Sequence, residues 1–234
     1  EFKDRGEEIR VNPLTYDEFV SAYQGGSRLA WTEFMMYGGM PFVMHKDGHA
    51  EKAAYLQGLF EKTYITDVIE RNQLKASKDV LEDLLNYLAS SVGSLTNATR
   101  LENTFKSIKK QNIAHQTISA YIDHFIDAFI IRKAERYDIK GRKYIGAQQK
   151  YFFTDVGLRN ARLNFRQQEE NHIMENILYN ELTARGFSVD VGVVETMVTN
   201  TAGNRQRSQL EVDFVCQRGH DRYYIQSDLT VADE

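Results

Sequence analysis

The sequence predicts an α+β fold, in which a helical N-terminal part is followed by a small mixed α/β domain. Three observations lead to this prediction. Apolar residues recur at helical spacing through much of residues 50–130, and the pattern changes to alternation after that point. A further amphipathic helix then precedes three runs rich in β-forming residues. With 234 residues, 42% hydrophobic and 12% aromatic, the chain is long enough to bury a sizeable core.

Helical periodicity is clearest in the middle of the chain. It predicts helices over residues 50–72, 78–91, 99–108 and 116–130, with Gly93 ending the second. The first fifth contains both prolines and several glycines and is expected to be irregular. Within it, residues 8–11 alternate like a short strand, and Thr15 with Glu18 forms a capping-box signature for a helix start.

The period changes from helical to extended after residue 130. Residues 131–139 and 143–154 are expected to form two strands around a turn at 140–142. Three helices followed by a basic hairpin is the order of a winged helix-turn-helix. A helix over 171–185, closed by Gly186, then precedes strands expected at 187–195, 209–216 and 222–229.

Positive charge is concentrated in the middle of the chain. The net charge is −4, but residues 95–165 hold 13 Lys and Arg against 6 Asp and Glu. Such a region could contact phosphate, or it could dock on an acidic neighbouring domain. The helix over 116–130 has no Lys or Arg, so we expect contact with the DNA backbone at most, and a packing role for the winged helix is an equal alternative. The candidate nucleic-acid residues are Lys109, Lys110, Arg132, Lys133, Arg136, Lys140, Arg142 and Lys143.

Several kinds of chemistry lack their motif. No Gly-x-x-x-x-Gly-Lys-Ser/Thr loop occurs, so this chain alone is not expected to hydrolyse ATP. No Cys or His group has zinc spacing, and no Gly-x-Ser-x-Gly elbow occurs. The single cysteine, Cys216, is expected to be buried and inert, which fits a reducing compartment. Without a signal peptide or a membrane-length apolar run, the expected location is the cytoplasm, with no membrane partner.

Acidic residues in the last domain form a candidate Mg²⁺ site. Glu211 and Asp213 share one face of a strand, and Glu175 lies within the apolar arc of its helix, so Glu175 and Asp213 could meet. Gln226, on the expected next strand, would complete the candidate metal-ligand set. A neutral amide is a poor Mg²⁺ ligand, and Asp228 stands where a cation would assist catalysis. A site without activity, whose buried acids bond to the backbone, is therefore the alternative.

Short segments spread in order along the chain carry a family resemblance. They are residues 8–11, 13–14, 37–41, 64–68, 150–159, 174–176, 211–214 and 224–226. Together they resemble the C-terminal region of prokaryotic AAA ATPases that carry a C-terminal domain of unknown function. The resemblance implies that residues 1–48 are the tail of an ATPase module and that residues 49–160 are a helical region with the winged helix. It also implies that residues 161–234 form a PD-(D/E)xK nuclease-like domain, expected to be truncated.

The same resemblance implies roles for particular residues. Asp213 would match the first acid of the nuclease motif, Gln226 the second and Asp228 the lysine, while Glu175 would match the helix acid. A P-loop domain that binds ATP and Mg²⁺ would lie in the parent protein, where it would be a partner of this segment. No cofactor is expected in the segment itself, apart from Mg²⁺ at the nuclease-like site.

These observations leave three hypotheses about function. The first is a non-catalytic segment of an AAA-type ATPase that regulates the parent protein or contacts nucleic acid. The second is a weak or relic Mg²⁺-dependent nuclease, and the third is a protein-interaction platform. Oligomerisation is compatible with each of them.

Overall fold

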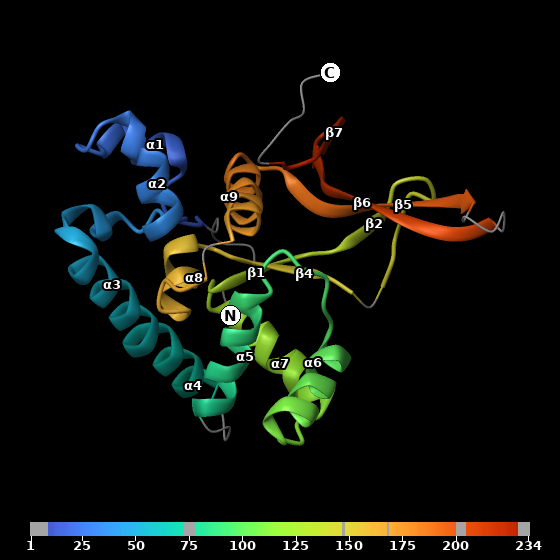
Figure 1. The fold of residues 1–234 in the computed structure, drawn as a ribbon, viewed down its shortest axis with the longest axis horizontal. Helices are drawn as coiled ribbons and strands as arrows, with labels where there is room; N and C mark the ends of the chain where they lie inside the picture. The colour runs from blue at the N-terminus through green and yellow to red at the C-terminus, as the bar shows by residue number, and fades with distance from the viewer. Residues whose placement is uncertain (1–8, 73–77, 147, 168, 200–204, 229–234) are drawn as a thin grey trace, which may run out of the picture.

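The computed structural model describes residues 9–72, 78–146, 148–167, 169–199 and 205–228 (Figure 1). It is a mixed α+β structure with a helical N-terminal part and sheets toward the C-terminus, as predicted. The helices of the first half are α1 (Tyr16–Ala22), α2 (Ser27–Tyr37), η1 (Pro41–His45), α3 (Gly48–Leu59), η2 (Phe60–Ile65), α4 (Thr66–Asn72), α5 (Lys78–Ser90), α6 (Ala98–Thr104), η3 (Phe105–Lys109) and α7 (His115–Asp127). Those of the second half are α8 (Val156–Arg162) and α9 (Glu170–Ala184).

Most of the predicted helices are confirmed. The helix expected over residues 50–72 is a continuous run of α3, η2 and α4, in which η2 has π-helical geometry. The capping box predicted at the start of α1 is present, because Thr15 and Glu18 exchange both expected hydrogen bonds. Gly93 and Gly186 follow α5 and α9 with φ of 72° and 80°, a conformation that favours glycine.

The first fifth of the chain differs from its prediction. Residues 9–11 do not form a strand, and Glu8 lies outside the described residues. Instead of irregular chain, α2 fills residues 27–37 between two glycines that bound it, Gly26 and Gly38. The glycines marked the ends of a helix whose N-cap makes no side-chain hydrogen bond, so its start lacked the usual sequence signal.

The strands form two sheets. They are β1 (Ile131–Ala134), β2 (Arg136–Asp138), β3 (Lys143–Tyr144), β4 (Lys150–Phe153), β5 (Ser188–Thr199), β6 (Arg205–Arg218) and β7 (Asp221–Ile225). β1 pairs antiparallel with β4, while the larger sheet has the order β3-β2-β5-β6-β7. In that sheet β2 and β5 are parallel and the other neighbours are antiparallel. The paired β5 and β6 project as a ribbon away from the helices (Figure 1).

The predicted hairpin is present, but its two halves belong to different sheets. Its base is the β1–β4 pair, and its outer part, β2 and β3, joins β5 of the predicted third domain. The main core likewise contains buried residues from Tyr37 to Cys216. The boundaries at residues 48 and 160, and the winged-helix and nuclease-like assignments, stay predictions.

Two strand limits are corrected. β6 begins at Arg205, before the start expected at residue 209, and residues 200–204 lie outside the described residues. β7 ends at Ile225, so Gln226 and Asp228 follow the strand and are not part of it.

β4 is the buried centre of the fold, and α9 holds it by its backbone. All four residues of β4 are buried. The side chain of Asn176 on α9, which is fully buried, accepts from the Phe153 N–H at 2.9 Å and donates to the Phe153 carbonyl at 2.7 Å. This amide replaces the partner that a further strand would provide, so α9 and β4 have a fixed register.

Replacing Asn176 by alanine should therefore destabilise the protein. The change leaves the buried Phe153 N–H without a partner and opens a small cavity, so we expect a loss of about 2–4 kcal/mol in the free energy of unfolding, measured with urea. Asn171→Ala, at an exposed position of the same helix, is the control and should change stability by less than about 0.5 kcal/mol. Equal effects of the two variants would contradict the role given to Asn176.

Candidate functional site

Three carboxylates and one ammonium group gather between α9, β4 and β6. Lys150, the first residue of β4, places its Nζ 2.6 Å from Glu175 Oε1 and 2.7 Å from Glu211 Oε1. Asp213 is buried and raises the pKa of Glu175 through its negative charge. Glu175 and Asp213 thus interact electrostatically, and Lys150 pairs with Glu175 and Glu211.

Asp213 is bonded to groups that follow β7. Its Oδ2 accepts from Gln226 Nε2 at 2.9 Å and from the Ser227 N–H at 2.7 Å. Gln226 therefore acts as a donor to the acid beside it, which orients its side chain toward Asp213. Asp228 is exposed and follows in the same extended segment.

The sequence did not reveal the cation of this cluster, Lys150, while position 228, which the resemblance matches to the motif lysine, holds Asp228. The cation comes from β4, about 60 residues before β6 in sequence, and not from position 228. The available signal was a lysine directly before the apolar run Tyr151–Phe153 in a strand that proves fully buried. A buried lysine requires a partner, but the sequence does not say which carboxylate supplies it.

Burial controls the charges of the cluster. It raises the pKa of Glu175 from 4.5 to about 7, although Lys150 acts in the opposite direction. For Lys150, burial lowers the pKa, but the charges and hydrogen bonds of Glu175 and Glu211 prevail and hold it above its ordinary value. The Lys150 ammonium group is therefore charged at neutral pH, while the pKa of Glu175 lies close to neutral pH.

The cluster does not fit a divalent cation in this arrangement. Mg²⁺ needs several oxygen ligands around one point, and here Lys150 Nζ occupies the space between Glu175 and Glu211. The Asp213 oxygen faces internal donors instead. Within the described ranges, no group of three or more His, Cys, Asp or Glu side chains is arranged to hold a metal ion. The predicted metal-ligand set, Glu175, Asp213 and Gln226, thus takes part in a network of hydrogen bonds and ion pairs, and its metal-binding role stays a prediction.

The candidate nucleic-acid residues fall into separate groups. Lys109 pairs with Asp83 at 2.7 Å, and Lys133 pairs with Glu135 at 3.0 Å. Arg136 is buried and donates to Gln209. Lys110 is exposed at the end of η3, distant in sequence from the exposed turn that holds Lys140, Arg142 and Lys143.

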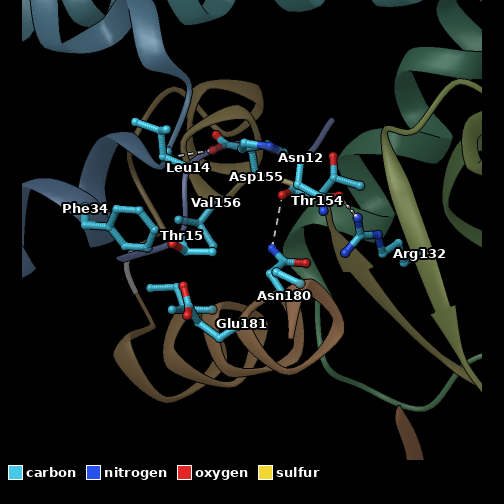
Figure 2. Close-up of a pocket in the computed structure, with 14 residues that line it drawn as sticks. Asn12, Leu14, Thr15, Phe34, Arg132, Thr154, Asp155, Val156, Asn180 and Glu181 are labelled. Atoms are coloured by element: carbon cyan, nitrogen blue, oxygen red, sulfur yellow. Dashed lines mark hydrogen bonds between the residues drawn. The ribbon is translucent and has the colours of Figure 1, made fainter. Parts of the chain in front are cut away.

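Arg132 lines a small cavity at the N-terminal end of the described chain, shown in Figure 2. Its guanidinium donates to Asn12, and burial lowers its pKa below the ordinary value. The cavity has a volume of about 30 Å³, room for about one water molecule, so it is a packing junction and not a ligand site. Arg132 thus contacts the N-terminal segment through Asn12, is partly buried, and also lines a second hollow of about 490 Å³.

Asp155, beside the same cavity, is a helix cap. It is buried at the start of α8, where its side chain accepts from the Leu158 and Gly39 N–H groups at 2.9 and 2.7 Å. Burial raises the pKa of Asp155 to about 6. The carboxylate thus joins α8 to the chain after α2, which accounts for the tight approach of Gly157 to the Tyr37 carbonyl.

Comparison with known proteins assigns a family. Residues 28–169 match the family described as "Domain of unknown function (DUF8612)", and the chain belongs to it. An uncharacterized protein of Haemophilus influenzae is 33% identical over 224 residues, which cover 94% of this chain and 52% of the relative. The chain thus spans about half the length of that relative. No solved structure matches the chain. None of the helices described here is long and apolar enough to cross a membrane.

The raised pKa of Glu175 predicts a pH dependence of stability. The folded protein holds this proton more tightly than the unfolded chain, so the stabilisation is full below pH 4.5 and is lost as the pH rises through 7. A shift from 4.5 to about 7 corresponds to at most roughly 3 kcal/mol. Urea unfolding between pH 4.5 and 8 should show this fall for the native sequence and a smaller one for Glu175→Gln; parallel curves would refute the assignment.

Removing the ammonium group should be costly. Lys150→Met leaves Glu175 and Glu211 without their shared cation, and we expect a loss of about 3–5 kcal/mol in unfolding free energy. Adding Glu175→Gln should restore part of the loss because it removes one buried charge. Lys133→Met, at a half-exposed ion pair on β1, is the control and should cost less than about 1 kcal/mol. Lys150→Met with no greater effect than Lys133→Met would show that the cluster does not depend on Lys150.

Proposed function

We propose that this chain is a non-catalytic module of a larger cytoplasmic AAA-type ATPase and that it contacts the backbone of nucleic acid. The observation that carries the proposal is the exposed basic turn between β2 and β3, which holds Lys140 and Arg142 and leads into Lys143 at the start of β3. Lysine and arginine bind phosphates without reading sequence.

The turn presents these side chains from a fixed backbone. Asp138 Oδ1 accepts from the Lys140 and Gly141 N–H groups at 3.1 and 2.9 Å, and this closes the turn. The Lys140 ammonium lies 3.2 Å from the Glu195 carbonyl on β5, where it is a neighbour of the projecting ribbon. A preordered turn loses less conformational entropy on binding, which favours a binding role.

Two observations support the larger parent protein. The ordered segments described above resemble the C-terminal region of AAA ATPases, and the relative from H. influenzae is about twice as long as the aligned chain. That length would accommodate a P-loop domain, and ATP and Mg²⁺ would belong there. The order of α6, α7 and the β1–β4 hairpin supports the winged-helix part, and α9 with β5, β6 and β7 supports the nuclease-like part.

The nuclease alternative has less support. A metal-dependent nuclease needs carboxylates free to bind Mg²⁺. Here Lys150 lies between Glu175 and Glu211, and Gln226 and Ser227 bond to Asp213. We therefore propose that this network stabilises the module and does not cleave nucleic acid.

The basic turn can be tested by charge removal. The triple variant Lys140→Ala, Arg142→Ala, Lys143→Ala should weaken binding to a labelled nucleic acid at least about ten-fold at low salt. The slope of the logarithm of the binding constant against the logarithm of the salt concentration should become less negative by up to about three. Fluorescence anisotropy over a salt series measures both. The variant Lys106→Ala, Lys109→Ala, Lys110→Ala removes the same charge from η3 and should have a small effect.

Three results would contradict the proposal. They are absence of binding at low salt, unchanged affinity of the β2–β3 turn variant, and an equal loss in the η3 variant. The last result would indicate attraction by net charge without a defined site. A protein partner captured by the sheet in the absence of nucleic-acid binding would favour the interaction-platform alternative.

A further inference from the structure

The larger sheet carries a hollow of about 370 Å³ next to the basic turn. Residues from each of its five strands line the hollow, together with the turn between β6 and β7. They are Tyr137, Tyr144, Ser188, Asp190, Val215, Gln217, Gly219 and Arg222. The hollow is thus a property of the assembled sheet, and no single strand contains it.

The other face of the same strands belongs to the core. Val189 and Val191 alternate with the lining residues on β5 and are buried, as are Phe214 and Cys216 on β6. Since side chains alternate between the faces of a strand, the lining residues point away from the core. Tyr144 and Tyr224 remain 58% and 52% exposed on the described structure. Exposed patches of large aromatic side chains often mark interaction sites, so this sheet face is a candidate binding surface.

The aromatic rings of this face are held in place. The rings of Tyr137 and Tyr144 meet edge to face with centroids 5.5 Å apart. The Tyr144 hydroxyl donates to Asp190 at 3.1 Å, and the Arg222 guanidinium lies 5.4 Å from the Tyr137 ring. Arg222 is also fixed by its hydrogen bond to Gln217. Rings and guanidinium are therefore preordered for stacking.

Positive charge adjoins the rings directly. Arg222 lies within the hollow, and the basic turn with Lys140 and Arg142 adjoins its edge at β3. Lys143, the neighbour of Tyr144 on β3, points to the opposite face. Asp190 is the acidic residue among those that line the hollow. It is partly buried and accepts a hydrogen bond from Tyr144, so its carboxylate already has a partner within the sheet. A strip of aromatic rings beside a line of cations matches a polymer with flat bases and a phosphate backbone.

We propose that the open face of this sheet binds single-stranded nucleic acid, with bases stacked on Tyr144 and Tyr224 and the backbone along Arg222 and the basic turn at Lys140 and Arg142. In a duplex, the base faces are covered by their neighbours, so the rings can only contact unpaired bases. This inference rests on the proposed function and gives it a substrate class.

The test compares matched tyrosines on one strand. Tyr224 and Tyr223 are neighbours on β7 with similar exposure, and they point to opposite faces. Tyr224 shares the face of Arg222, whereas Tyr223 packs against Phe187. The probes are a labelled 12-nucleotide oligothymidine and a labelled duplex of the same length. The readout is the fluorescence anisotropy of the labelled nucleic acid as the protein is added at low salt.

The oligothymidine should bind at least about ten-fold more tightly than the duplex. Tyr224→Leu and Tyr144→Leu should each weaken its binding by roughly 5- to 100-fold, the usual effect of losing one stacking ring. Tyr223→Leu should leave it within about two-fold. Tyr144→Phe, which keeps the ring and loses the Asp190 hydrogen bond, should retain most of the affinity.

Failure of this inference is distinguishable from failure of the proposed function. If the basic-turn variant weakens binding but duplex and single strand bind equally, or the Leu variants at 144 and 224 have no effect, the single-strand assignment is overturned and the backbone contact stands. An equal loss in Tyr223→Leu also overturns it, since that ring lies on the other face. If neither probe binds at low salt, both proposals fail.

Discussion

The buried ammonium group of Lys150 is the interaction on which the arrangement of β4, α9 and β6 depends. Its contacts at 2.6 and 2.7 Å reach one carboxylate on a helix and another on a strand of the larger sheet. Neither Glu175 nor Lys150 can be buried alone without a cost of several kcal/mol, so the elements are stable only when they meet. Asn176, the residue after Glu175, then fixes the backbone of β4. Apolar packing supplies the stability of the core, and these polar contacts specify its register.

Much of the fold follows from periodicity in the sequence. α5, α7 and α9 begin and end within about three residues of their predicted limits, and α5 and α7 have a clear apolar stripe. The buried state of Cys216 was also predicted, and burial raises its pKa to about 11, which makes the thiol inert at neutral pH. α2 was missed because its ends are set by glycines and by packing, and its N-terminus lacks a capping side chain. Local signals fail where tertiary contacts define the element.

The candidate site was predictable only in part. The carboxylates could be found because acids in apolar patterns are unusual, and Glu175 and Asp213 do belong to one network. Their partner Lys150 could not be assigned, since pairing between residues 150, 175 and 211 depends on tertiary contacts that bring β4, α9 and β6 together. The burial of Arg136 and the partial burial of Arg132 were not predictable for a similar reason. The sequence locates them in a basic hairpin, and tertiary structure turns them toward Asn12 and Gln209.

The hairpin from β1 to β4 has a mechanical consequence. Glu135 separates β1, which pairs with β4 at the helical core, from β2, which pairs with β5. The Val191 N–H bonds to the Glu135 carbonyl at 2.8 Å, so even this bend is tied to the larger sheet. One continuous stretch of backbone therefore belongs to both halves of the molecule, and a tilt of the ribbon must displace the strand that packs on α7. A displacement of one half is therefore expected to reach the other through this shared backbone.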